Sequence, residues 1–222
     1  MKKPNPNLSH LLALALLVIL SVSFLPQTQA VRAVGPADRA AGPVPITTIL
    51  RSEGFEESSF PPPGWATQAI GGSTEWQRTN DTGYPPGLGT HGGLWLAYFN
   101  SLTAPAGSAA RLYTTQLDFT ASRSYFISFW MLNDYSLPSA ADEVQVEVDP
   151  GTGFVAVGAP ILRYAPSRDW AQHIVDLTAY AGNMVRVSLK GISDFGYDIY
   201  IDDITIYATT PGYQLFLPLV KH

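Results

Sequence analysis

The sequence predicts an all-β protein, a jelly-roll β-sandwich formed by a single domain. Short runs rich in Val, Ile, Tyr, Phe and Trp recur roughly every ten residues, between turns rich in Gly and Pro. No segment keeps a helical hydrophobic period. Only 14% of the 222 residues are charged and 12% are aromatic, which is typical of β-proteins. Many short strands between frequent turns indicate a sandwich.

The first expected strand covers residues 49–55 and is followed by Pro61-Pro62-Pro63-Gly64, which neither a helix nor a central strand tolerates. The run 94–99 follows a Gly-rich loop, and 111–117 comes next. The run 125–132 is apolar on both faces apart from Ser128, so we expect it to be a central strand.

The run 143–148 alternates strictly, which predicts valines facing inward and polar residues facing outward. It ends in Asp149-Pro150-Gly151-Thr152-Gly153, a strong turn signal. Two further strands are expected over residues 170–177 and 184–192, and the last over 197–207.

The last expected strand contains a break in its alternation. Ile199 and Ile201 would share one face of a regular strand, whereas Ile204 and Ile206 would lie on the other. All four can face one core only if a β-bulge lies at Asp202-Asp203. Two adjacent carboxylates on a re-aimed backbone favour a site for a hard cation. The alternative is a solvated acidic pair at a strand end.

The chain divides into four segments. Residues 1–30 have a basic start, an apolar run and a small-x-small cleavage site at Thr28-Gln29-Ala30, which predicts a secretory signal peptide. Residues 31–46 are an expected linker, 47–207 the domain, and 208–222 an apolar tail containing Leu217-Pro218-Leu219-Val220. We expect an exported protein with no transmembrane span after signal cleavage.

The charge of the chain argues against some partners, and its cysteine content limits how the fold can be stabilised. Removal of residues 1–30 takes away two lysines and no acid, so the formal charge goes from −5 to −7. This acidic balance argues against nucleic acid or an anionic membrane as the main partner. The chain has no cysteine, so an exported fold would depend on its core, on a bound ion, or on both.

A series of motifs resembles a known family. In chain order they are Glu53-Gly54-Phe55-Glu56, Phe60-Pro61-Pro62-Pro63-Gly64-Trp65, Glu75-Trp76, Leu112-Tyr113-Thr114-Thr115-Gln116-Leu117-Asp118, Tyr125-Phe126-Ile127-Ser128-Phe129-Trp130, Trp170 and Ile201-Asp202-Asp203-Ile204. Their order is similar to the cleaved-adhesin family and the related choice-of-anchor J domains of secreted bacterial proteins, and to the MAM domains of animal surface proteins. Gln116 departs from the usual proline.

The resemblance implies a non-catalytic adhesion module, secreted or at the cell surface, that binds an extracellular protein or a polysaccharide. Several members hold calcium, and the matching acids make Glu53 and Asp203 the first expected Ca²⁺ ligands, with Asp202 and Glu56 behind them. Such modules are often attached to enzymes, whereas no catalytic domain accompanies this one.

Aromatic residues in or beside Gly- and Pro-rich loops are the expected ligand contacts, because Tyr and Trp offer a large contact area at low entropic cost. These residues are Trp76, Tyr84, Trp95, Tyr98, Phe99 and Tyr135. The alternative is that they belong to the core, and for Phe129 and Trp130 we expect a core position.

The runner-up function is a glycan hydrolase of jelly-roll type, with Glu143, Gln145 and Glu147 on one strand face. Residues i and i+4 of a strand lie about 13 Å apart, beyond the roughly 5–9.5 Å that separates glycosidase carboxyl pairs. We therefore expect a solvated strand face. His91 is expected to be a polar loop residue, and no Gly-x-Ser-x-Gly elbow is present.

Overall fold

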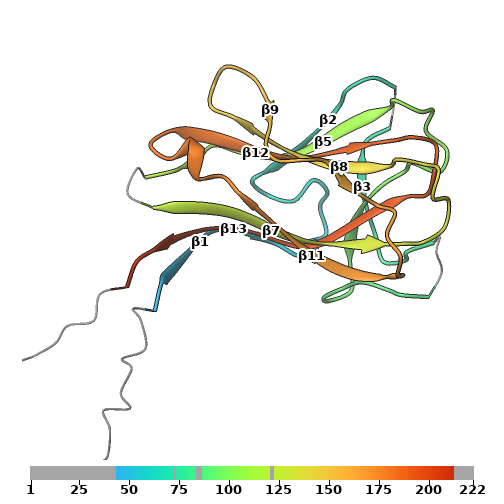
Figure 1. Ribbon diagram of the computed structural model, residues 1–222, viewed down its shortest axis with the longest axis horizontal. Helices are drawn as coiled ribbons and strands as arrows, with labels where there is room; N and C mark the ends of the chain where they lie inside the picture. Colours follow the sequence, from blue (N-terminus) through green and yellow to red (C-terminus); the bar gives the residue numbers. More distant parts are fainter. Residues whose placement is uncertain (1–43, 73, 84–86, 121–122, 213–222) are drawn as a thin grey trace, which may run out of the picture. The chain divides into compact units, whose positions relative to one another are not determined.

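The computed structural model describes residues 44–72, 74–83, 87–120 and 123–212 (Figure 1). The predicted signal peptide, residues 31–43 of the predicted linker, Tyr84, and the tail from residue 213 lie outside the described residues.

The described residues form strands and contain no α-helix, which confirms the all-β prediction. The strands are β1 Ile46–Glu53, β2 Trp65–Ala69, β3 Trp76–Thr79, β4 Leu96–Phe99, β5 Ala109–Thr114, β6 Leu117–Asp118, β7 Ser124–Asn133, β8 Glu143–Asp149, β9 Val155–Ala156, β10 Ile161–Leu162, β11 Asp169–Asp176, β12 Met184–Ile192 and β13 Ile199–Thr210, with one 3₁₀ turn at Thr178–Tyr180. Within these residues, no helix has the length and apolar character needed to cross a membrane.

The strands form two antiparallel sheets that pack as a jelly-roll sandwich, seen as two layers in Figure 1. One sheet has the order β11-β7-β13-β4-β3, with β1 also paired to β13. The other has the order β10-β8-β12-β5-β2, with β6 on β12 and β9 on β8. Strand β7 lies between β11 and β13, so the expected central position of this strand is confirmed.

The ends of the domain lie slightly outside the predicted boundaries. Ile46 of β1 pairs with Thr210 of β13, so the first strand begins inside the predicted linker and the last ends inside the predicted tail. The start of β1 and the end of β13 are both longer than predicted because the two strands pair with each other in one antiparallel ladder. The short strands β2, β3, β9 and β10 were not predicted.

Strand β8 has the predicted inner face but not the predicted outer face. Val144, Val146 and Val148 are buried in the core. Gln145 and Glu147 are buried as well, so the expectation of a solvated face is wrong. The Glu147 carboxylate lies 2.5 Å from Arg111 Nε of β5, which is two strands away in the same sheet, beyond β12. The long side chains of this sheet therefore cover its outer face.

The predicted bulge in β13 is confirmed. Ile199, Ile201, Ile204 and Ile206 all have no exposed surface and belong to one core. The pairing of β13 with β7 shifts register between Asp202 and Thr205. The extra residue reverses the alternation, so that isoleucines from both halves of the strand face inward.

The bulge prediction can be tested by comparing two isoleucines. Ile204→Ala should lower the free energy of unfolding by about 2–5 kcal/mol, because it leaves a cavity in the core. Ile49→Ala, on the paired strand β1 where Ile49 is 63% exposed, should cost less than about 1 kcal/mol. Urea denaturation measures both. Equal losses would contradict the inward orientation of Ile204.

Candidate functional site

The candidate site lies at the bulge, where one side of β13 stops pairing with β4 and begins to pair with β1. Before the bulge, residues Ile199–Ile201 pair with β4; after it, residues from Ile204 onward pair with β1. Two segments meet the bulge between the ends of β1 and β4: the turn at Gly54–Glu56 and residues 91–95, which lead into β4.

Asp202 is buried and anchors the loop that precedes β4. Its Oδ2 accepts hydrogen bonds from the backbone N–H groups of His91 at 3.0 Å and Gly92 at 3.1 Å. Its Oδ1 accepts from the backbone N–H of Asp203 at 2.8 Å. Burial raises the pKa of Asp202 to about 6, against the opposing effect of these hydrogen bonds. The cost of burying the carboxylate is offset by three backbone donors.

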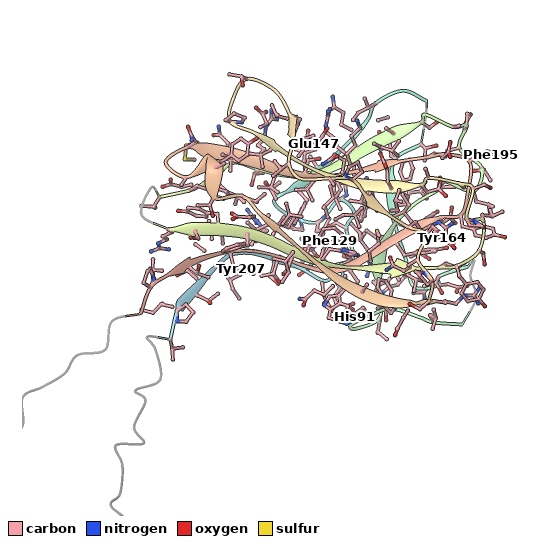
Figure 2. All side chains as sticks on the ribbon, in the orientation of Figure 1. His91, Phe129, Glu147, Tyr164, Phe195 and Tyr207 are labelled. Carbon is pink, nitrogen blue, oxygen red and sulfur yellow. The ribbon has the colours of Figure 1, made fainter. Side chains whose placement is uncertain are left out.

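Asp203 is partly exposed and contacts the same loop. Its backbone lies in the left-handed region, with φ of 45°, and its Oδ2 lies 2.6 Å from His91 Nδ1. The His91 ring stacks on Trp130 with centroids 3.9 Å apart and meets the edge of Trp170 at 5.9 Å. His91 thus lies on the outer side of the layer that holds β7 (Figure 2).

This arrangement corrects one expectation. Trp130 is half-buried on the outer face of its sheet beneath His91, rather than in the core. Phe129, the preceding residue, points into the core as expected.

Glu56 and Glu53 approach the bulge from β1. Glu56 Oε1 accepts from the backbone N–H groups of Leu94 at 2.8 Å and Trp95 at 3.0 Å. Glu53 pairs across the ladder with Ile204, next to the bulge. Burial raises the pKa of Glu53, although the backbone N–H of Phe55 donates to it at 2.6 Å. Three of the four predicted acids, Asp202, Asp203 and Glu56, therefore contact residues 91–95, whereas Glu53 is placed beside the bulge by its pairing with Ile204.

The fit of Ca²⁺ to these acids depends on space and on donor type. A Cβ atom placed on Gly92 would lie 2.6 Å from Asp203 Oδ2, and one on Gly54 would lie 3.3 Å from Oδ1. The missing Cβ atoms let the Asp203 carboxylate pack closely against the backbone at Gly92 and Gly54, and carboxylate oxygens are the ligands that Ca²⁺ prefers. Among the described residues, no group of three or more His, Cys, Asp or Glu side chains is placed to hold a metal. A cation here would need backbone carbonyl oxygens as well.

Two of the predicted contact aromatics are core residues. Trp76 lies on β3 and is 2% exposed, and its Nε1 donates to the backbone oxygen of Ala110 at 3.0 Å. Phe99 has no exposed surface. Both point between the sheets rather than along the loops, so Phe99 is not placed to contact a ligand, whereas Trp76 still belongs to the lining of the depression that contains Trp95.

Trp95 and Tyr98 line two depressions on either side of the edge strand β3. The first has a volume of about 400 Å³ and is lined by Trp95 together with Phe60, Glu75, Gln77 and Arg78. The Arg78 guanidinium lies 3.6 Å from the Trp95 ring centre, a cation–π contact.

The second depression has a volume of about 210 Å³ and is lined by Tyr98, Asp81, Asp198 and Tyr200. The Tyr98 hydroxyl donates to Gln77 Oε1 at 2.8 Å, which links the two depressions. Burial raises the pKa of Asp198, and the Tyr200 hydroxyl donates to its carboxylate at 3.3 Å.

Tyr135 is 54% exposed and lines neither depression; the Arg168 guanidinium lies 5.2 Å from its ring centre. Gln77, Asp198 and Tyr200 were not identified from the sequence. The spacing of Asp198 and Tyr200, two residues apart on one strand face, was the available signal.

The two packed antiparallel sheets define this protein as a β-sandwich, and the comparison with known proteins agrees with that fold. No protein-family model matches the chain, and no curated protein matches its sequence. Solved structures match its fold. The K1 cleaved adhesin domain of Lys-gingipain from Porphyromonas gingivalis W83 is 20% identical, with a TM-score of 0.53 over 72% of this chain and 97% of that domain.

Two other solved structures that match the fold belong to proteins whose names describe different functions. The CBM22-1 xylan-binding domain from Paenibacillus barcinonensis Xyn10C is 16% identical, with a TM-score of 0.50 over 74% of this chain and 97% of that one. The Stig cyclase Fisc from Fischerella sp. TAU is 17% identical, with a TM-score of 0.56 over 76% of this chain and 100% of that one. At these identities the likeness establishes a shared β-sandwich fold.

The carboxylates of Asp202 and Glu56 hold residues 91–95 by accepting hydrogen bonds from their backbone N–H groups, and we call this arrangement the clamp. The clamp predicts that alanine substitutions at two glycines with positive φ lower the free energy of unfolding by different amounts. Gly89→Ala places a Cβ where no atom lies within 4 Å, whereas Gly93→Ala places one 2.2 Å from Glu56 Oε1 at a comparable φ. Both variants should lose about 1 kcal/mol from backbone strain. Gly93→Ala should lose roughly 1–3 kcal/mol more, because Glu56 must release the N–H groups of Leu94 and Trp95.

Urea denaturation gives the two stabilities, and hydrogen exchange reports the amides directly. Faster exchange at Leu94 and Trp95 is expected in Gly93→Ala alone. Identical stabilities and exchange rates in the two variants would rule out the Glu56 clamp.

Proposed function

We propose that this protein is a secreted, non-catalytic binding module that recognises an extracellular polysaccharide along the β3–β4 edge. The observation that carries the proposal is the pair of depressions beside β3, each combining an aromatic ring with polar side chains. The Tyr98–Gln77 hydrogen bond connects one lining residue of each depression.

The side chains of this surface suit sugars. An aromatic ring such as that of Tyr98 offers an apolar face to the C–H groups of a pyranose, while its hydroxyl stays polar. The amide of Gln77 and the carboxylates of Glu75 and Asp81 can exchange hydrogen bonds with sugar hydroxyls. Two neighbouring depressions suit a ligand of several sugar units rather than a single one.

The fold adds independent support. One solved neighbour is named as a xylan-binding domain and another as a cleaved adhesin domain. An extracellular protein is therefore the alternative ligand, and the exposed ring of Tyr135, away from both depressions, is its expected contact.

The hydrolase reading of Glu143 and Glu147 lacks structural support. Glu147 is buried and ion-paired with Arg111, and Lys190 Nζ lies 3.9 Å from its other oxygen. A carboxylate held by two cations cannot approach a glycosidic bond, and its partner four residues away on the same strand is too distant.

The polysaccharide surface is tested by two tyrosines given the same substitution. Tyr98→Ala should weaken binding to a polysaccharide identified on a glycan array by about 2 kcal/mol, roughly 30-fold, because it removes a contact anchor. Tyr135→Ala should leave that affinity unchanged. Isothermal titration calorimetry measures the affinity, and circular dichroism verifies that both variants are folded.

Loss of binding in Tyr135→Ala with retention in Tyr98→Ala would reject the β3–β4 surface and assign the polysaccharide contact to Tyr135. Release of reducing sugar during incubation with the polysaccharide would reject the non-catalytic assignment.

We further propose that Ca²⁺ stabilises the fold at the bulge, through Asp203 and Glu53 with Asp202 and Glu56 behind them. The support is that Asp202, Asp203 and Glu56 all contact residues 91–95, and that Glu53 pairs with Ile204 beside the bulge. Backbone carbonyl oxygens complete the ligand set.

Calcium at a hundredfold excess over Kd should stabilise the native state by about 2.7 kcal/mol, because the ion binds only the folded protein. The melting temperature should therefore fall on addition of EGTA. This shift should vanish in Asp203→Ala and persist in Asp118→Ala, which removes an exposed acid from the other sheet. A wild-type melting temperature that EGTA leaves unchanged would refute calcium binding without affecting the polysaccharide proposal.

A further inference from the structure

A third depression lies at the opposite side of the sandwich from β3. Strand β11 is the edge of one sheet, and the β9–β10 segment lies at the corresponding edge of the other. The space between them has a volume of about 430 Å³ and is lined by residues 157–159, Ile161 and residues 173–176. This volume lies within the range of small-molecule sites, about 300–1,000 Å³.

The walls of this lateral pocket are apolar and continuous with the core. Val157, Ile161 and Val175 pack against the main core from half-buried positions. Ile174, which also lines the pocket, is 57% exposed, so part of the entrance is apolar. The pocket therefore favours a ligand with an apolar body.

One polar atom faces this apolar space without a partner. His173 pairs with Phe129 across the strand ladder, and the two rings lie 5.6 Å apart, so the imidazole points between the sheets. His173 Nε2 is buried and has no hydrogen-bond partner among the described residues. Most buried polar atoms in proteins are hydrogen-bonded, whereas this nitrogen has no partner and is covered from solvent, so a ligand must displace the atoms that cover it to bind it.

Charge limits the class of ligand. Burial lowers the pKa of His173, so the imidazole is mainly neutral at pH 7 and attracts no anion. Asp176 is exposed at the mouth of the pocket and repels anions. A hydroxyl group suits Nε2 in either imidazole tautomer, because it can both donate and accept a hydrogen bond.

We propose that the lateral pocket between β11 and the β9–β10 segment binds a small, uncharged, largely apolar molecule with a single hydroxyl, such as a phenol. Its apolar body contacts Val157, Ile161 and Val175, and its hydroxyl forms a hydrogen bond with His173 Nε2. The site is separate from the polysaccharide surface and does not depend on it.

Three probes of similar shape test the proposal on the full chain: p-cresol, toluene and 4-methylbenzoate. Each is titrated while NMR records the ¹⁵N signals of the His173 imidazole. We expect p-cresol to shift these signals in a saturable way. Toluene should bind roughly fivefold more weakly, because it lacks the hydroxyl that reaches Nε2. 4-Methylbenzoate should produce no saturable shift over the same range.

A matched pair of alanine variants locates the binding. Ala159→Leu adds bulk to the pocket lining, whereas Ala106→Leu makes the same change at an exposed position in the β4–β5 connection. Binding of p-cresol should be lost in the first and retained in the second. Unmoved His173 signals, equal affinities for p-cresol and toluene, or unchanged binding in Ala159→Leu would each overturn the proposal.

Discussion

The bulge at Asp202-Asp203 is the constraint around which the first sheet is organised. A regular strand would bury Ile199 and Ile201 and expose Ile204 and Ile206, because a shift of one residue exchanges the two faces. The extra residue buries all four and lets β13 pair with β4 before the bulge and with β1 after it. The bulge therefore determines both which isoleucines of β13 enter the core and where the gap between β4 and β1 lies.

The gap is closed by carboxylates that bind backbone groups. Asp202 and Glu56 accept hydrogen bonds from four backbone N–H groups of the same loop, those of His91, Gly92, Leu94 and Trp95. Carboxylate bonds to backbone N–H groups are among the stronger hydrogen bonds in proteins. This clamp sets the direction in which the chain enters β4, and so the positions of Trp95 and Tyr98 beside β3.

The sequence predicts correctly those features that depend only on the residue pattern within a single strand. The phase of the four isoleucines is sufficient to place the bulge, and the valines of β8 are sufficient to place its inner face. Sequence-based prediction failed where the outcome depends on a second strand. Glu147 is buried because Arg111 of β5 covers it, and Trp76 is buried while Trp95 lines a depression. Neither difference is visible in local sequence, because it arises from pairing over long separations.

The position of β13 within its sheet also bears on how the chain folds. The last strand of the described chain is not an edge: it lies between β7 on one side and β4 with β1 on the other. Until the polypeptide has been made as far as Thr210, strand β1 has no neighbour and β4 lacks its inner one. Non-local pairing of this kind folds slowly. The pairs β7–β11 and β3–β4 can form earlier, but the first sheet becomes one continuous sheet only when β13 joins them.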